Sequence, residues 1–126
     1  MVGLLLAVAA CAGPGQGSRS MARAFLDRHY VAIDLVAARE LTAALALSKI
    51  DREIELTRGM VIDADTAKPR INYRLERFEE GDLAARYVFE LTIRAPGLEP
   101  YQKFVTLGLR LTADGWRVTN YSEADP

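Results

Sequence analysis

The chain of 126 residues has few of the side chains that build disulfide and metal sites. With one cysteine and one histidine it can form no internal disulfide, no multi-cysteine metal site and no paired-histidine zinc site. Its 16 basic and 17 acidic side chains nearly cancel and are interspersed, which argues against a nucleic-acid binder. No nucleotide-binding loop, nucleophile elbow or kinase motif occurs. The sequence therefore predicts no cofactor and no metal site.

Long apolar runs are lacking too. The run at residues 2–12 (VGLLLAVAACA) is shorter than the roughly 20 residues with which a helix crosses a bilayer, and its length is typical of an export signal. Residues 8–11 (VAAC) resemble the lipobox of bacterial lipoproteins, and this resemblance implies cleavage and lipidation at Cys11. The glycine-rich stretch 13–17 (GPGQG) suits a tether.

Three interpretations of this first segment stay open, because residues 1–3 (MVG) lack the basic residue expected of an export signal. It is a lipoprotein leader, the end of a longer transmembrane anchor, or a buried element with an inert Cys11. The first two predict a cell-envelope protein that is attached to a membrane and faces the periplasm or the extracellular side. We expect residues 1–17 to be leader or anchor plus tether, and residues 18–126 to be one domain.

A helical pattern follows. Apolar and aromatic residues recur at steps of three and four along one stripe: Ala22, Leu26, His29, Ile33 and Val36, widened by Phe25 and Tyr30. A second stripe lies among charged residues: Leu41, Ala44, Leu45, Leu47, Ile50 and Ile54. Asp34 is expected to mark the break between the two helices. Gly59 is expected to end the second helix, since glycine readily takes the left-handed conformation at that place.

After Pro69 the period of the pattern changes to two, which indicates strands. Alternation runs through residues 71–75, 83–93, 101–111 and 116–120, and Asp114-Gly115 is a strong hairpin signal. Helices and a meander of this kind can bury their apolar faces only against each other. The sequence therefore predicts an α+β fold in which N-terminal helices pack on a curved four-stranded antiparallel sheet.

The side chains expected to face inward are mostly large and apolar. From the strands they are Tyr73, Leu75, Tyr87, Phe89, Leu91, Val105, Leu107, Leu109 and Trp116, and from the helices Phe25, Leu26, His29, Ile33, Leu41 and Leu45. Their volume should nearly fill the interior and leave a narrow opening with tyrosines at its rim. A filled interior leaves no room for a substrate between a general acid and a general base.

The order of the elements and the ending DGWRVTNY at residues 114–121 resemble the NTF2-like superfamily of α+β cones. The resemblance covers roughly residues 20–123 and implies helices that lie in the concave face of the sheet. That superfamily includes isomerases, dehydratases and hydrolases, and also many non-catalytic binding and assembly domains. Membership alone therefore does not decide the function.

Four polar residues are candidates for a ligand-binding site in the cone: His29, Tyr30, Asp34 and Tyr87. As a base, His29 would need an orienting partner such as Asp34 or Tyr87, and a satisfied core histidine is the simpler interpretation. We assign no catalytic residue.

These observations favour a membrane-tethered, non-catalytic domain that binds an unidentified envelope protein or assists its assembly. The alternative is a small-molecule binding protein or an enzyme that uses the cone pocket. The charged second helix is either a solvated face or a docking surface. A homodimer through the outer face of the sheet is also expected.

Overall fold

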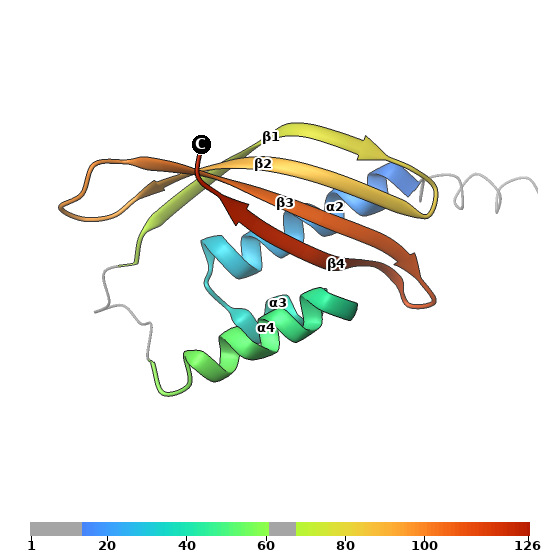
Figure 1. Ribbon diagram of the computed structural model, residues 1–126, viewed down its shortest axis with the longest axis horizontal. Coiled ribbons are helices and arrows are strands. Elements are labelled where there is room, and N and C mark those ends of the chain that lie inside the picture. The colour runs from blue at the N-terminus through green and yellow to red at the C-terminus, as the bar shows by residue number, and fades with distance from the viewer. Residues whose placement is uncertain (1–13, 61–67) are drawn as a thin grey trace, which may run out of the picture.

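The computed structural model describes residues 14–60 and 68–126 of the chain. Helices come first and a four-stranded antiparallel sheet follows, which confirms the predicted α+β class. The strands form one curved sheet, and the helices lie against one of its faces (Figure 1). Cys11 and the rest of the apolar leader lie outside the described residues, so lipidation stays a prediction.

The first predicted helix is interrupted. The helical segments are α2 (Pro14–Leu26), the π-helix η1 (Asp27–Val31), α3 (Leu35–Arg39) and α4 (Ala44–Leu56). The predicted stripe through Val36 is wrong, because Val36 is 66% exposed and Ile33 is only half-buried. Ile33 takes a φ of 55°, outside the right-handed helical region. Asp34 then caps α3 by accepting a hydrogen bond from the Ala37 N–H at 3.0 Å, so the predicted break is confirmed.

Helix α4 ends as predicted but turns a different stripe to the core. Gly59 has the left-handed conformation expected there, with a φ of 87°. Leu45, predicted to face inward, is 52% exposed, whereas Ala46 is buried. The reason is that Leu41 precedes the helix and accepts a backbone hydrogen bond from Val118 of strand β4 (Gly115–Ala124) at 2.9 Å. The step from Leu41 to Leu45 is therefore not a helical one.

The sheet is a meander in the order β1-β2-β3-β4. Besides β4 its strands are β1 (Arg70–Glu80), β2 (Ala84–Arg94) and β3 (Tyr101–Thr112). Alternate residues face the helices as predicted, but the pattern was extended too far. Leu83, Tyr101 and Leu111 are 70%, 44% and 43% exposed, because they lie at or beyond the strand ends. Gly115 has a φ of 104° in the predicted hairpin turn.

A bulge in β4 changes which residues face the core. The β3–β4 register passes over Thr119, so that Gly108 pairs with Asn120 while Leu109 pairs with Val118. The alternation shifts by one residue at this point. As a result Tyr121 is buried and Asn120 is exposed.

The core closes around large side chains, as predicted. Phe25, Leu26, Tyr87 and Phe89 have no exposed surface, and burying a large apolar side chain contributes roughly 1.5–3 kcal/mol. Other predicted members of the buried cluster are Leu41, Leu91, Val105, Leu107, Leu109 and Trp116. Tyr73 and Leu75 pack against this cluster and are partly buried. Ile50, on the predicted second stripe, is also buried, and the cluster further includes Ala46, Val118 and Tyr121, which the inward-facing set did not contain.

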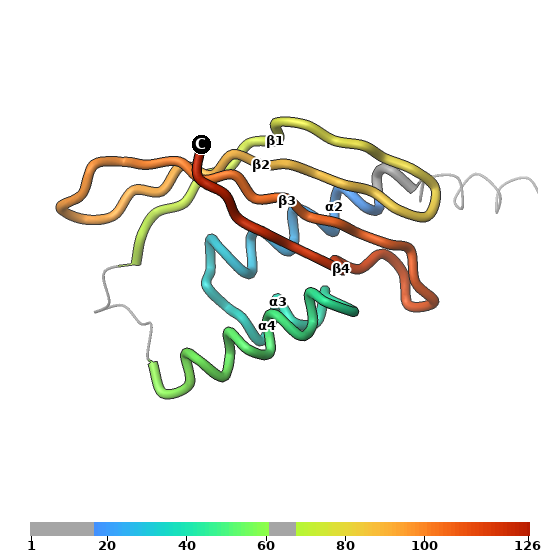
Figure 2. The backbone as a smooth tube through the Cα atoms, viewed as in Figure 1, coloured from blue at the N-terminus to red at the C-terminus, as the bar shows by residue number. Residues whose placement is uncertain are grey.

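The two ends of the molecule differ. Where α2 begins, Ser18 hydrogen-bonds Tyr87 at 2.5 Å and Arg19 donates to Glu80 at 2.9 Å, beside the β1–β2 hairpin. At the opposite end α4 terminates and β1 starts, as the backbone trace shows (Figure 2). We call this second end, formed by residues 29–36, 53–60 and 68–71, the open end.

Candidate functional site

The π-helix η1 carries two of the four predicted ligand-binding residues into the open end. Its wide turn is closed by the Ala32 N–H, which donates to the Asp27 carbonyl at 2.8 Å. The consecutive residues His29 and Tyr30 are 8% and 9% exposed. Single π turns are rare and recur at functional sites, which directs attention to these two side chains.

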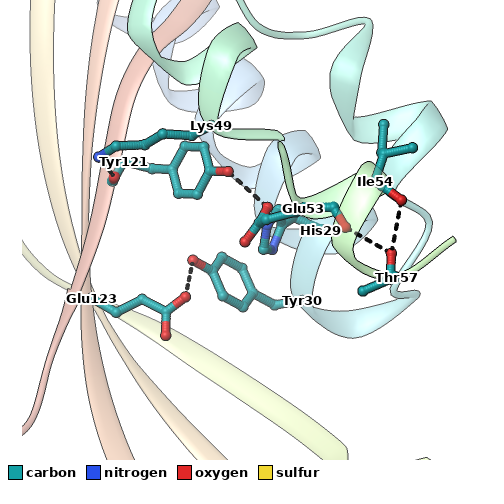
Figure 3. A network of polar contacts seen from close by, with 8 residues as sticks. All are labelled: His29, Tyr30, Lys49, Glu53, Ile54, Thr57, Tyr121 and Glu123. Atoms are coloured by element: carbon teal, nitrogen blue, oxygen red, sulfur yellow. Dashed lines mark hydrogen bonds and ion pairs between the residues drawn. The ribbon is translucent and has the colours of Figure 1, made fainter. Parts of the chain in front are cut away.

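Glu53 of α4 joins η1 to the sheet. One oxygen of its carboxylate, Oε2, lies 2.8 Å from His29 Nε2 and accepts the Tyr121 hydroxyl at 2.7 Å. His29 also stacks on Phe25, with ring centroids 5.3 Å apart. Figure 3 shows Glu53 between the histidine and the tyrosine. Since Glu53 accepts, Nε2 is the nitrogen that carries hydrogen in this arrangement.

A second polar contact closes the same layer. The Tyr30 hydroxyl donates to Glu123 Oε2 at 3.0 Å (Figure 3). Lys103 reaches the other oxygen of that carboxylate at 3.4 Å. Lys49 of α4 donates to the Tyr121 carbonyl at 2.7 Å. The polar groups of the open end therefore bond to one another across η1, α4 and β4.

These contacts shift the ionisation of three groups. Burial alone would raise the pKa of Glu53, but the hydrogen bonds from His29 and Tyr121, with the charge of Lys49 nearby, hold this pKa below its ordinary value. Burial first, and then the Glu123 carboxylate, raise the pKa of Tyr30. Burial and the Glu53 carboxylate raise the pKa of Tyr121 in the same way. The result is an ionised acceptor held by neutral tyrosine donors.

This arrangement leaves little for proton transfer. Nε2 of His29 is taken by Glu53, and Nδ1 is buried without a hydrogen-bond partner among the described residues. A general base must reach the proton that it abstracts, directly or through one water. A buried Nδ1 offers no such path in this arrangement, and the contacts of Nε2 hold the ring in place.

Two adjoining hollows at the open end form what we call the open-end groove. The first, of about 310 Å³, lies beside His29 and Tyr30 and is lined mainly by Ile33, Leu35, Leu56 and Ile71. The second, of about 490 Å³, shares Ile33, Leu35 and Thr57 with the first and extends along Val36, Ile54, Met60 and Lys68. The groove is largely apolar, and Lys68, whose Nζ donates to the Ala32 carbonyl at 3.1 Å, lies at its edge.

The four predicted ligand-binding residues do not form one site. His29 and Tyr30 line the first hollow together. Asp34 lines the second, with its carboxylate used as the cap of α3. Tyr87 lies at the other end of the molecule, fully buried, and also donates to Glu80 at 2.8 Å. The pairing of His29 with Asp34 or Tyr87 that a catalytic base would need is therefore absent from the described part of the chain.

Sequence reasoning missed Glu53, Tyr121 and Glu123. Glu53 was grouped with the charged residues of the second helix, interpreted as either a solvated face or a docking surface. It stands three residues after Ile50 and seven after Ala46, on the buried stripe of α4. That spacing is a signal that could have found it. Tyr121 was missed because the bulge at Thr119 shifts the alternation of β4 by one residue.

Within the described residues, no group of three or more histidine, cysteine or acidic side chains has the arrangement to hold a metal ion. None of the helices described is both long and apolar enough to cross a membrane.

Comparisons with known proteins found no sequence match but did find distant structural similarity. No protein-family model matches the sequence, and no curated protein sequence matches it either. The chain is similar to the crystal structure of the intermembrane space region of the chloroplast protein ARC6, with 12% sequence identity and a TM-score of 0.42. The alignment covers 87% of this chain and 89% of the other.

Proposed function

We propose that this protein is a non-catalytic binding domain, tethered to a membrane outside the cytoplasm, whose open-end groove binds an apolar segment of an envelope protein. One observation carries the proposal. At the open end the polar groups are bonded to one another, whereas the apolar ones are exposed.

The polar and the apolar side chains of the open end differ widely in their exposure. His29, Tyr30 and Tyr121 are all less than 10% exposed and each has a carboxylate partner. Leu56 and Met60, on the rim of the groove, are 69% and 67% exposed. Exposed apolar side chains that gather in one place, next to a groove, are typical of binding surfaces. A partner that covers these side chains buries their apolar surface without disturbing any buried hydrogen bond.

The tether and the family are part of the same proposal. The lipobox-like residues 8–11 support an anchor, with Cys11 as the attachment point, although residues 14–17 of the expected tether belong to α2. Since α2 begins at the end opposite the open-end groove, an anchored domain would direct the groove away from the membrane. The order of helices and strands supports membership of the NTF2-like superfamily, in which non-catalytic assembly domains are common.

The test changes one exposed leucine in the groove and one elsewhere. Leu56→Asp places a charge in the groove, and Leu98→Asp makes the same change at a leucine of equal exposure, 67%, in the β2–β3 loop. Both variants should fold with unchanged circular dichroism. The partner that co-purifies with the full chain from native membranes should be lost with Leu56→Asp and kept with Leu98→Asp. Equal recovery with both variants contradicts the proposal.

The second candidate function is the binding of a small molecule in the same groove. An enzyme that uses this groove is the catalytic variant of that candidate. The observation that favours it is the size of the second hollow, which lies in the range of small-molecule sites and has the basic residues Arg58 and Lys68 on its border. Native mass spectrometry of the purified full chain distinguishes the two. A bound small molecule that disappears with Leu56→Asp favours this candidate over a protein partner.

A further inference from the structure

The helices leave the outer face of the sheet uncovered (Figure 1). A glycine, Gly108, lies on this face in the interior of β3, where glycine is less stable than a residue with a side chain. Its φ is not positive, and an added Cβ would meet no atom closer than the Asn120 carbonyl oxygen at 4.0 Å. Neither backbone conformation nor packing therefore requires a glycine here. A glycine inside a strand marks a bulge or the close approach of a ligand or another backbone, and Gly108 lies beside the bulge of β4 as well as beneath an open surface.

The missing side chain leaves a hollow of about 340 Å³ above Gly108. Polar side chains dominate its border, and those used in the argument are Arg86, Thr106, Arg110, Asn120 and Ser122. No aspartate or glutamate lines it. The nearest acidic residue in the register is Glu79 of β1, which pairs with Arg86 and shares with it a neighbouring hollow, so Arg86 stands between a carboxylate on one side and the hollow above Gly108 on the other.

Two arginines flank the hollow diagonally. Arg86 lies directly opposite Gly108 in the register, and Arg110 lies two residues along β3 on the same face. Diagonal neighbours of this kind are about 7–8 Å apart, so two guanidinium groups can converge on one small group between them. Neither arginine forms an ion pair with any residue in 14–60 or 68–126. Guanidinium groups bind carboxylate and phosphate oxygens in a bidentate manner.

Neutral donors complete the border. Thr106 and Ser122, paired across β3 and β4, present hydroxyl groups. The Asn120 side-chain oxygen accepts from Lys49 at 2.9 Å, which leaves the amide N–H groups as the part of Asn120 that is available to a ligand. Two cations and several donors, with no carboxylate, are the groups that an oxyanion needs.

We propose that the hollow above Gly108 binds an oxyanion of phosphate size, held between Arg86 and Arg110. The site is separate from the open-end groove and does not depend on the function proposed for it. The oxyanion is either a soluble phosphate compound or the headgroup of a membrane lipid, and the experiment has an arm for each source.

The first arm is calorimetric titration of the full chain with inorganic phosphate at constant ionic strength. Arg86→Gln and Arg110→Gln should each weaken binding about tenfold, which is the effect of losing a charged hydrogen bond. Gly108→Val fills the hollow without changing a charge, and it should abolish binding while circular dichroism and the urea midpoint show an intact fold. The matched control is Arg94→Gln, which removes the same charge from the same face of β2 outside the hollow and should change affinity less than twofold.

The second arm is co-sedimentation with phosphatidylcholine vesicles, with and without phosphatidylglycerol. Phosphate binding that Gly108→Val abolishes, without a gain from phosphatidylglycerol, assigns the site to a soluble oxyanion. A gain from phosphatidylglycerol that Gly108→Val and Arg110→Gln both remove assigns it to a lipid headgroup. Absence of binding in both arms overturns the proposal, and so does binding that Arg94→Gln weakens as much as Arg110→Gln does.

Discussion

Glu53 holds the open end together, and replacing it tests that role quantitatively. In Glu53→Ala the Nε2–H of His29 and the hydroxyl of Tyr121 lose their acceptor, although the two residues are 8% and 5% exposed. An unsatisfied buried donor costs about 1–3 kcal/mol, so the loss of both costs about 2–6 kcal/mol. The Glu53 side chain is 35% exposed, so water replaces part of these bonds. We therefore expect a loss of about 2–3 kcal/mol of unfolding free energy.

Urea denaturation followed by circular dichroism measures this loss. A change of that size should lower the urea midpoint by roughly 1–2 M. Glu53→Gln keeps one acceptor oxygen and should cost less than Glu53→Ala. Glu55→Ala is the control, since Glu55 lies on the same helix, is 67% exposed and pairs only with exposed Arg58, and it should cost less than about 0.5 kcal/mol. If Glu53→Ala and Glu55→Ala have the same midpoint, the cluster does not stabilise the open end.

The same cluster makes the stability depend on pH. The pKa of Glu53 is lower in the folded protein than in the unfolded chain. A group of this kind stabilises the fold above its unfolded pKa, and its contribution is lost as the pH falls through the folded value. The difference in stability between the wild type and Glu53→Gln should therefore be present at neutral pH and disappear in acid.

Three further predictions follow from the described residues and from the leader. Burial and the nearby carboxylates raise the pKa of Tyr30 and Tyr121, so ultraviolet titration should show that both stay neutral above pH 10 until the protein unfolds, and ionisation of all five tyrosines in a folded chain would contradict this. Exchanging the charges of Arg86 and Glu90 should weaken a dimer through the outer face of the sheet in sedimentation experiments, and a strictly monomeric wild type refutes that dimer. Cys11→Ser should abolish metabolic palmitate labelling, whereas unchanged labelling would exclude Cys11 as the attachment point.

The sequence predicts the parts of the fold in which one regular hydrophobic pattern packs against one continuous layer of neighbouring residues. The strands of the meander alternate because each has the same helices on one side, so Tyr87, Phe89 and Leu91 were placed correctly. The core was predicted from volume and polarity alone. The errors lie where the backbone leaves its regular geometry.

Two such departures from regular backbone geometry determine which side chains meet in the candidate site. The left-handed Ile33 ends the first helical run and brings Asp34 to a cap, so Asp34 is not available to His29. The bulge at Thr119 turns Tyr121 inward to Glu53. A single sequence shows neither departure, because an isoleucine does not favour φ above zero and a threonine is itself typical of regular strands. The polar network follows from these two local choices.

Site-specific photocrosslinking in native membranes is the most direct test of the central claim that the open-end groove binds an apolar segment of a partner protein. A photoreactive residue is placed in the full chain at Val36, which is 66% exposed in the groove, and in a second sample at Leu98, which is 67% exposed elsewhere. The account predicts a discrete protein adduct from position 36 that Leu56→Asp removes, and none from position 98. No adduct from position 36, or the same adduct from both positions, would contradict it.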